Sequence, residues 1–338
     1  MLNPPLTTPT VSIIVDTFFR PAMLRHAVGS LLAQTWKHVE VVIVDNGSTP
    51  ETKPVIAELT ARSPAVKVVA FTENQHSFED PRILYRIAYN AGLRASTGDL
   101  VFHMNDDDWM APDFCERIAR LFVDNPACTT AIGLPVPVRP DGSEIDLRQQ
   151  NQRPRYMPGQ ELALAVLDGR PGWANPGHGF VMRREALEAA GGFHEYYEQH
   201  LMHGVVAFGV TGFDPEARMY WRYHDSQLNK LWTQHGLVGL PFLQGMLADC
   251  RIEERWTAAF GAETARKVVR TLERKACASA AWALVDNLAD FRFAAVRRIL
   301  GWVGLNPRVW AEVPAKVWQK RRWFAASLLR AAGLRKPT

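Results

Sequence analysis

The stretch that decides the fold is "VSIIVDTFFRPAMLRHAVGSLLAQTWKHVEVVIVDNGSTPET", residues 11–52. It begins with a short apolar run, Val11–Val15, which predicts a buried strand. Apolar residues then recur at helical spacing as far as Leu32, and the run Val39–Val44 predicts a second strand. The cluster "DNGSTPET" after it is rich in turn and helix-starting residues. The stretch therefore predicts strand, helix, strand and helix in succession.

The same alternation continues to about residue 125. Val66–Phe71 and Asp99–Met104 predict two more strands, and residues 81–96 predict a helix with Ile83 and Ile87 on one face. Near-continuous apolar strands separated by helices are typical of a mostly parallel sheet that is covered on both faces. We therefore predict an α/β, Rossmann-like domain whose ligands bind beyond the carboxyl ends of the strands.

Acidic residues follow three of these strands. Asp16, Asp45 and the run Asp106–Asp108 each stand at the end of a different strand. Because the carboxyl ends of parallel strands lie at one edge of a sheet, we expect these residues to converge. The competing interpretation is a solvated acidic turn, in which Asp108 or Asp113 caps the next helix.

The rest of the chain is organised differently. Residues 129–173 are rich in Pro, Gly, Arg and Gln and predict a loop-rich section that shapes a pocket, and Gly179–His200 returns to strand, helix and turn. From Leu228 the pattern is mainly helical. We predict one domain over residues 1–230 and a helical C-terminal extension over residues 231–338.

Composition is that of an ordinary globular protein, with 338 residues, 47% hydrophobic residues and a net charge of +4. Four widely spaced cysteines argue against a structural zinc site or a disulfide framework and fit a reducing compartment. The first ten residues do not have the pattern of a signal peptide, and no apolar run is long enough to span a bilayer. These features predict a cytoplasmic location.

The end of the chain is basic. Lys316–Thr338 carries seven Lys or Arg residues, two Trp residues and no acidic residue. Such a tail predicts contact with an anionic surface. We favour the inner face of a membrane over nucleic acid, because no nucleic-acid-binding fold surrounds the tail.

The quoted motifs resemble those of the family 2 glycosyltransferases. Residues 11–52 are similar to a strand, P-T-Y/F-N-R, a helix, Q-T and a strand ending in V-D-D/N-G-S. "YNAGLRASTGDLVFHMNDDDWMAP" (89–112) is similar to R-N-x-G followed by A-x-G-x-Y-I-x-F-L-D-x-D-D. "MRREALEAAGGFHE" (182–195) and "RYHDSQ" (222–227) are similar to R-R-x-x-L-x-x-x-G-G-F-D-E and R-x-H-x-x-S. The resemblance implies a GT-A fold and a transferase that uses a nucleotide-diphosphate sugar, usually inverting and usually metal-dependent.

The resemblance also implies which residues would hold the diphosphate. A leaving diphosphate needs a cation, and hard oxygen ligands suit Mg²⁺ or Mn²⁺. Asn105 stands where the D-x-D-D pattern has its first Asp, so Asp107 becomes the expected metal ligand and Asp106 lies near the ribose or sugar hydroxyls. His224 is the expected nitrogen ligand, unless it is simply packed or solvated.

The base of the nucleotide would meet other strand ends. The resemblance implies that Asp45 accepts a hydrogen bond from the base, although an Asp in "DNGS" also suits a turn. Asp16, which replaces the family's Pro, and Thr17 would face the same base. Arg20 matches the family's Arg and would reach the base or the phosphates; a solvated Arg at a helix start is the alternative.

Two more residues are assigned to the nucleotide sugar. Asn90 matches the Asn of R-N-x-G, but the Arg of that motif falls on Tyr89. Arg86 lies one helical turn earlier and could take over its phosphate contact; a surface Arg is the alternative.

The general base is where the sequence departs from the family. The family places a Glu-Asp pair soon after G-G-F-D-E, and here the expected Asp falls on Gln199, which cannot take a proton. Glu198 and His200 are the remaining candidates, with His203 as a third.

On the acceptor side, Trp173 and His178 suit contact with a sugar ring, and packing of Trp173 in the core is the competing interpretation. The resemblance divides residues 1–230 into a nucleotide-binding half, 10–125, and an acceptor-binding half, 126–230. It implies transfer of a sugar, from UDP by preference, to a hydroxyl of a glycan or lipid-linked glycan in bacterial surface polysaccharide synthesis.

Two other functions remain open at this point. A non-catalytic protein that binds nucleotide sugars would keep the donor site and lack the base. A Rossmann dehydrogenase is less consistent with the sequence, because no G-x-G-x-x-G follows the first strand.

Overall fold

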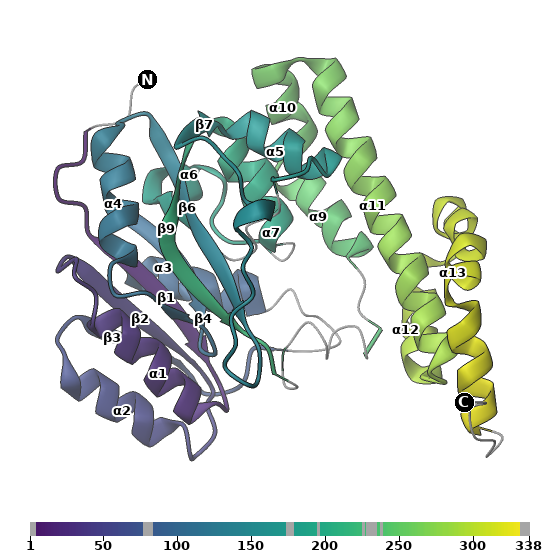
Figure 1. The fold of residues 1–338 in the computed structure, drawn as a ribbon, viewed down its shortest axis with the longest axis horizontal. Coiled ribbons are helices and arrows are strands. Elements are labelled where there is room, and N and C mark those ends of the chain that lie inside the picture. The colour runs from purple at the N-terminus through teal and green to yellow at the C-terminus, as the bar shows by residue number, and fades with distance from the viewer. Residues whose placement is uncertain are drawn as a thin grey trace. The chain divides into compact units, whose positions relative to one another are not determined.

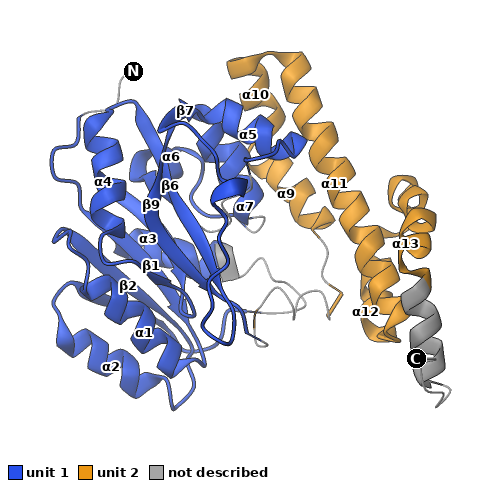
Figure 2. Cartoon of the chain, viewed as in Figure 1, with its two compact units in different colours: residues 1–224 blue, residues 225–338 orange. Residues whose placement is uncertain are grey.

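The computed structural model describes most of the chain, namely residues 5–76, 84–173, 179–194, 197–224, 227, 235–236 and 239–331. The chain forms two compact units, residues 1–224 and residues 225–338 (Figure 2).

Unit 1 is built on one mixed β-sheet (Figure 1). Its strands are β1 (Val11–Thr17), β2 (Val39–Asn46), β3 (Val66–Phe71), β4 (Leu100–Asn105), β5 (Trp109–Met110), β6 (Cys128–Val138), β7 (Tyr156–Pro158), β8 (Phe180–Arg183) and β9 (Val210–Arg222). They lie in the order β3-β2-β1-β4-β8-β6-β9-β5, and β7 pairs with β9. Strands β1 to β4 are mutually parallel, whereas β8 is antiparallel to β4 and β6.

Helices connect these strands. They are α1 (Pro21–Leu32), α2 (Lys53–Arg62), the π-helix η1 (Leu84–Tyr89), α3 (Asn90–Ala95), α4 (Phe114–Asp124), η2 (Arg148–Gln150), α5 (Gly159–Asp168), α6 (Arg184–Ala189), α7 (Tyr197–His200), η3 (Leu201–Val205) and η4 (Val206–Phe208). The predicted α/β fold, with a largely parallel sheet between helices, is confirmed.

The two faces of the parallel strands carry different helices. Side chains of successive strand residues point to opposite faces. Ile13 and Val15 belong to the core that also contains the buried residues of α1, α2 and α4. On the other face, α3 packs so closely that a Cβ on Gly92 would lie 2.5 Å from Ile14. This alternation also decides which face each residue at a strand end joins.

The prediction of a loop-rich section over residues 129–173 is wrong in part. The eleven-residue strand β6 begins just before it, and α5 lies inside it. Pro135 and Pro137 interrupt the usual strand pattern, and a proline cannot donate a backbone hydrogen bond. Here β6 nevertheless keeps its register with β9 through both prolines, opposite Met219 and Trp221.

Unit 2 is helical, as predicted for the C-terminal extension. Its described helices are α9 (Leu240–Asp249), α10 (Ile252–Phe260), α11 (Ala262–Ala289), α12 (Phe293–Val303) and α13 (Pro307–Ala331). The long helix α11 packs against each of the other four, with Trp256, Leu284 and Ile299 fully buried or nearly so. Within the described residues, none of these helices is both long and apolar enough to cross a membrane.

Candidate active site

The acidic run follows β4 and is buried rather than solvated. Asp106, Asp107 and Asp108 are each less than a tenth exposed. The neighbouring strand β1 supplies their partners: Thr17 Oγ1 donates a hydrogen bond to Asp106 Oδ2 at 2.8 Å. Arg20 Nη1 donates to Asp106 Oδ1 at 2.8 Å and to Asp107 Oδ2 at 2.7 Å. A single guanidinium group therefore bridges two carboxylates at the carboxyl edge of the sheet.

Burial changes the protonation of this group of residues. It raises the pKa of Asp106 to about 7, and the charges of Asp107 and Asp16 add to that effect, while Arg20 opposes it. Burial and the Asp107 charge also raise the pKa of Asp108 well above its usual range. The pKa of Arg20 is raised because the nearby carboxylates outweigh its burial. Like charges held this close form a site that attracts a further cation.

Strand β9 closes the site from the other side. His224 Nε2 lies 2.8 Å from Asp107 Oδ2. Arg222 holds the turn itself, because its backbone N–H donates to Asp108 Oδ1 at 3.3 Å and its Nε donates to the Asp107 carbonyl oxygen at 3.1 Å. The Arg222 guanidinium lies over the Trp109 ring, 4.6 Å from its centroid. Arg222 thus positions the turn that contains Asp107 and Asp108.

The interpretation of Asp108 as a helix cap is wrong. Helix α4 begins at Phe114, and the residue at its N-cap position is Asp113, whose side chain forms no capping hydrogen bond. Asp108 instead accepts hydrogen bonds from the Arg222 N–H and from Asn105 Nδ2, the latter at 3.4 Å. The turn is fixed by β9 rather than by the next helix.

The donor atoms suit a divalent ion that also binds phosphate. No cluster of three or more His, Cys, Asp or Glu side chains is arranged as a metal site among the residues that the structure describes. Asp107 Oδ2 and His224 Nε2 nevertheless lie 2.8 Å apart and would offer one oxygen and one nitrogen ligand. Mg²⁺ and Mn²⁺ need only one or two protein ligands when phosphates and waters supply the others. These residues therefore fit such an ion.

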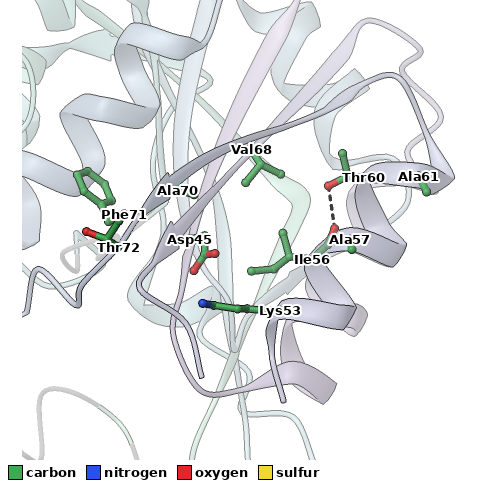
Figure 3. A pocket seen from close by; sticks show the side chains of 10 residues that line it. All are labelled: Asp45, Lys53, Ile56, Ala57, Thr60, Ala61, Val68, Ala70, Phe71 and Thr72. Carbon is green, nitrogen blue, oxygen red and sulfur yellow. Dashed lines mark hydrogen bonds between the residues drawn. The ribbon is translucent and has the colours of Figure 1, made fainter. Parts of the chain in front are cut away.

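Asp45 lies at the end of β2 and lines a pocket of about 750 Å³ between α2 and β3 (Figure 3). Asp45 Oδ1 accepts a hydrogen bond from the Ser48 N–H at 2.7 Å, so the residue does form the turn that the sequence suggests. Its carboxyl group also faces the pocket, and in Figure 3 the Lys53 amine points toward it. The two interpretations of Asp45 are therefore compatible.

Asn90 and Arg86 contact a different part of the unit. The Asn90 side chain accepts from the Phe193 N–H and donates to the Phe193 carbonyl oxygen, both at 2.8 Å. Arg86 Nη2 lies 3.4 Å from His194 Nε2. These contacts hold the loop that precedes α7, and a direct role of either residue in nucleotide binding stays a prediction.

The base candidates lie on α7 and in η3 and differ in accessibility. His200 is fully buried, and its Nε2 lies 2.8 Å from the Gly192 carbonyl oxygen. His203 is buried as well, whereas Glu198 is partly exposed. Among these three residues, Glu198 is the one that solvent reaches most readily.

The acceptor-side residues are only partly described. Trp173 is 8% exposed, and the Arg170 guanidinium lies 4.7 Å from its ring centroid. Burial of this degree favours packing over an open sugar platform. His178 lies outside the described residues.

Sequence reasoning missed His103, which lies on the neighbouring strand β4 and contacts Asp16. This histidine is fully buried, and its Nε2 is 2.9 Å from Asp16 Oδ1. A polar residue within an otherwise apolar strand was the available signal. The aromatic support of Arg222 by Trp109 and Tyr220, whose rings stack 5.1 Å apart, had no such signal.

Comparison with known proteins connects this geometry to one family. The model described as "Glycosyl transferase family 2" matches residues 12–191, which is more than half of the chain. An uncharacterized glycosyltransferase of Nostoc sp. is 31% identical over 180 residues, which is 53% of this chain and 52% of that protein. The GalNAc(5)-diNAcBac-PP-undecaprenol beta-1,3-glucosyltransferase of Campylobacter jejuni is 31% identical over 100 residues, or 30% of each chain. The matched region thus spans about half or less of these relatives.

Two solved structures share the fold at low sequence identity. A mannosyltransferase of Pyrobaculum calidifontis in complex with GDP-Man and Mn²⁺ is 17% identical, with a TM-score of 0.52 over 96% of this chain and 88% of that one. S. aureus TarS 1-349 in complex with UDP-GlcNAc is 13% identical, with a TM-score of 0.59 over 97% of this chain and 93% of that one. At these identities the likeness concerns the GT-A type fold alone.

Proposed function

Because the chain belongs to glycosyl transferase family 2, we propose that it transfers a sugar from a nucleotide-diphosphate donor to a hydroxyl of a glycan or lipid-linked glycan. One observation carries this proposal: the buried carboxylates after β4 meet Arg20 from beyond β1 and His224 from beyond β9. Three strands thus direct charged groups to one point at the carboxyl edge of the sheet. That arrangement suits a diphosphate that departs together with a cation.

The donor would lie across the strand ends. Asp45 would accept a hydrogen bond from the base, and the pocket that it lines is large enough for a nucleobase. The Thr17–Asp106 pair would face the ribose, and Asp107 with His224 would hold the ion that binds the diphosphate. A bound Mn²⁺ or Mg²⁺ would supply positive charge that stabilises the leaving diphosphate. UDP is the nucleotide that we propose first, because the Asp45 carboxylate can accept a hydrogen bond from the ring N–H of uracil.

Inverting transfer requires a base that takes the proton of the acceptor hydroxyl. Glu198 is our first candidate, because it is partly exposed and a carboxylate can accept that proton directly. His200 would first have to leave its contact with the Gly192 carbonyl oxygen. The alternative function, a non-catalytic protein that binds nucleotide sugars, is favoured by the Gln199 substitution alone.

We also propose a peripheral contact with an anionic membrane, where lipid-linked acceptors reside. Phe293, Arg297 and Leu300 lie at helical spacing on α12 and are exposed, and Leu305 in the turn after α12 is 92% exposed. Residues 291–311 contain four arginines and no acidic residue. A helix face that exposes apolar and basic residues together suits the headgroup region of an anionic bilayer. The described part of α13 extends the same basic character toward the tail.

The donor proposal is tested by thermal shifts with UDP- and GDP-sugars, in the presence and absence of Mn²⁺. A ligand that binds the folded state raises its melting temperature, so binding is measured without knowledge of the acceptor. Asp107→Asn should abolish the metal-dependent part of the shift. Asp113→Asn is the matched control, because this carboxylate is partly exposed, contacts Arg117 and lies beyond the turn.

The outcomes separate the two functions. Absence of any shift in the wild-type protein with every donor would refute both. Binding followed by slow donor hydrolysis supports the transferase, whereas tight metal-dependent binding without any turnover supports the non-catalytic alternative.

A further inference from the structure

Several positions at which this chain departs from the family pattern lie together in space. Asp16 stands where the pattern has Pro, Tyr89 where it has Arg, and Asn105 where it has Asp. His103 stands where the pattern A-x-G-x-Y-I-x-F-L-D-x-D-D has Phe. Independent substitutions would scatter over the domain. These four form one connected cluster beneath the donor site.

The contacts within this cluster are direct. His103 Nε2 lies 2.9 Å from Asp16 Oδ1, so the imidazole N–H can donate a hydrogen bond to the carboxylate oxygen. The Tyr89 ring stacks on the His103 ring with centroids 3.6 Å apart. Asn105 is the residue opposite Asp16 in the register of β4 with β1. The loss of the pattern's Arg and Asp is thus accompanied by a new polar pair, Asp16–His103.

The pair is arranged so that only its carboxylate reaches the surface. The His103 side chain is fully buried, whereas that of Asp16 is 20% exposed. The rings of Phe193 and Tyr197 lie edge-to-face with the His103 ring, with centroids 6.2 Å and 5.5 Å away. An imidazole enclosed by three aromatic rings has little freedom to turn. The buried His103 ring therefore fixes the orientation of the Asp16 carboxylate.

The position of Asp16 indicates what it can meet. Strand β1 lies between β2, whose last-but-one residue is the base-binding candidate Asp45, and β4, which is followed directly by the ribose candidate Asp106. Thr17, the next residue, pairs with Asp45 in register. Asp16 points to the opposite face of the sheet, toward α3, because strand side chains alternate. A nucleoside that covers the ends of these strands would have Asp16 at its edge on the α3 side.

We infer that Asp16 is a specificity-determining residue that accepts a hydrogen bond from an N–H or O–H group of the donor nucleoside, and that His103 is the positioning residue that holds its carboxylate for that contact. The inference rests on the proposed function, because it concerns the same donor. It adds a nucleoside contact on the α3 side of the sheet, opposite Asp45. A carboxylate already held in its binding orientation loses little conformational freedom when the ligand arrives.

The test is a double-mutant cycle with Asp16→Ala, His103→Phe and the double variant. Calorimetry measures the binding of UDP and GDP in the presence of Mn²⁺. A hydrogen bond to a charged group contributes roughly 1.5–3 kcal/mol, so Asp16→Ala should weaken the preferred nucleotide by about tenfold or more. His103→Phe should weaken it nearly as much, and the double variant should be no weaker than Asp16→Ala alone.

Controls separate positioning from stability. His103→Gln keeps an N–H donor and should restore most of the affinity that His103→Phe loses. Asp99→Ala removes a carboxylate at the opposite end of β4, where it accepts from the Thr10 N–H, and should leave nucleotide affinity unchanged. Binding of 2′-deoxy-UDP identifies the ligand group: if the wild-type protein loses as much affinity for it as Asp16→Ala loses for UDP, the ribose 2′-hydroxyl is the donor.

Two results would overturn the inference. If Asp16→Ala binds the nucleotide with unchanged affinity, Asp16 does not contact the nucleoside. If the losses of affinity add in the double variant, His103 acts through packing and does not position Asp16. If His103→Phe fails to fold, His103→Leu, which also lacks an N–H donor, takes its place in the cycle. A wild-type protein that binds neither nucleotide refutes the proposed function itself, which is a different failure.

Discussion

Arg20 offers the sharpest test of the electrostatics of the site. Its Nη1 lies 2.8 Å from Asp106 Oδ1 and 2.7 Å from Asp107 Oδ2, and all three side chains are largely buried. Arg20→Met would leave two adjacent buried carboxylates without this cation. Breaking a buried ion pair by removal of one partner costs about 3–5 kcal/mol. We expect the lower end, about 3 kcal/mol, because burial already raises the pKa of Asp106 to about 7 and a proton can replace the lost charge.

The same substitution should increase the response to metal. Arg20 Nη1 and a divalent ion at Asp107 both neutralise the Asp107 carboxylate, so the two cations compete for it. In EDTA, Arg20→Met should lower the melting temperature of unit 1 by roughly 6–12 °C, at 2–4 °C per kcal/mol for a unit of this size. Excess Mn²⁺ should raise the melting temperature more in the variant than in the wild-type protein. Differential scanning calorimetry in both buffers measures the two effects.

The matched control is Arg25→Met on α1. Arg25 Nη2 lies 2.8 Å from Glu58 Oε2, but both side chains are about half exposed, so solvent screens the pair and its loss should change stability little. This variant should respond to Mn²⁺ as the wild-type protein does. The reasoning is refuted if the stability that Arg20→Met loses in EDTA, calculated from its melting temperature, is less than about 1 kcal/mol. It is also refuted if the Mn²⁺ response of the variant is not larger than that of the wild-type protein.

Two further predictions concern stability and location. Burial alone would raise the pKa of Glu40, but its ion pair with Lys67 and its hydrogen bonds, including one from Ser12 Oγ, lower it to about 2. The stability that the Glu40 carboxylate contributes is therefore present above its unfolded pKa of 4.5 and is lost as the pH falls toward 2. With allowance for solvent screening at half-exposed Lys67, Glu40→Gln should lower the free energy of unfolding by about 2–3 kcal/mol at pH 7 and by much less near pH 2. Urea unfolding at each pH measures this difference. The combined variant Leu300→Glu and Leu305→Glu should abolish sedimentation with anionic vesicles and leave donor-induced thermal shifts unchanged, and retained sedimentation would contradict the membrane proposal.

Periodicity and turn chemistry were sufficient to predict the parallel half of the sheet. Apolar runs such as Val39–Val44 have one consistent structural interpretation when helices separate them. The antiparallel half was harder, because β6 contains Pro135 and Pro137 and takes its register from β9, some 80 residues away in sequence. Long-range pairing of this kind leaves no local pattern in the strand itself.

The candidate site shows the same division. Strand ends predicted that acidic residues would gather at one edge, and the charge of Asp16 does act on Asp106 there. The buried partner of Asp16 could not be found in this way, because the pairing of His103 with it depends on the registration of β4 with β1. A departure from a family pattern is visible in the sequence, but only the structure shows that several departures are in contact.

The base assignment can be narrowed by the conformational change that each candidate requires. His200 is fully buried beside the Gly192 carbonyl oxygen, so an acceptor hydroxyl would reach it only if α7 or the preceding loop moved. That loop is held by both hydrogen bonds between Asn90 and the Phe193 backbone, which such a movement would have to break. Glu198 is partly exposed on the same helix, so solvent already reaches it without such a movement. Because reaching His200 would break two partly buried hydrogen bonds and reaching Glu198 would not, we propose Glu198 before His200 as the base.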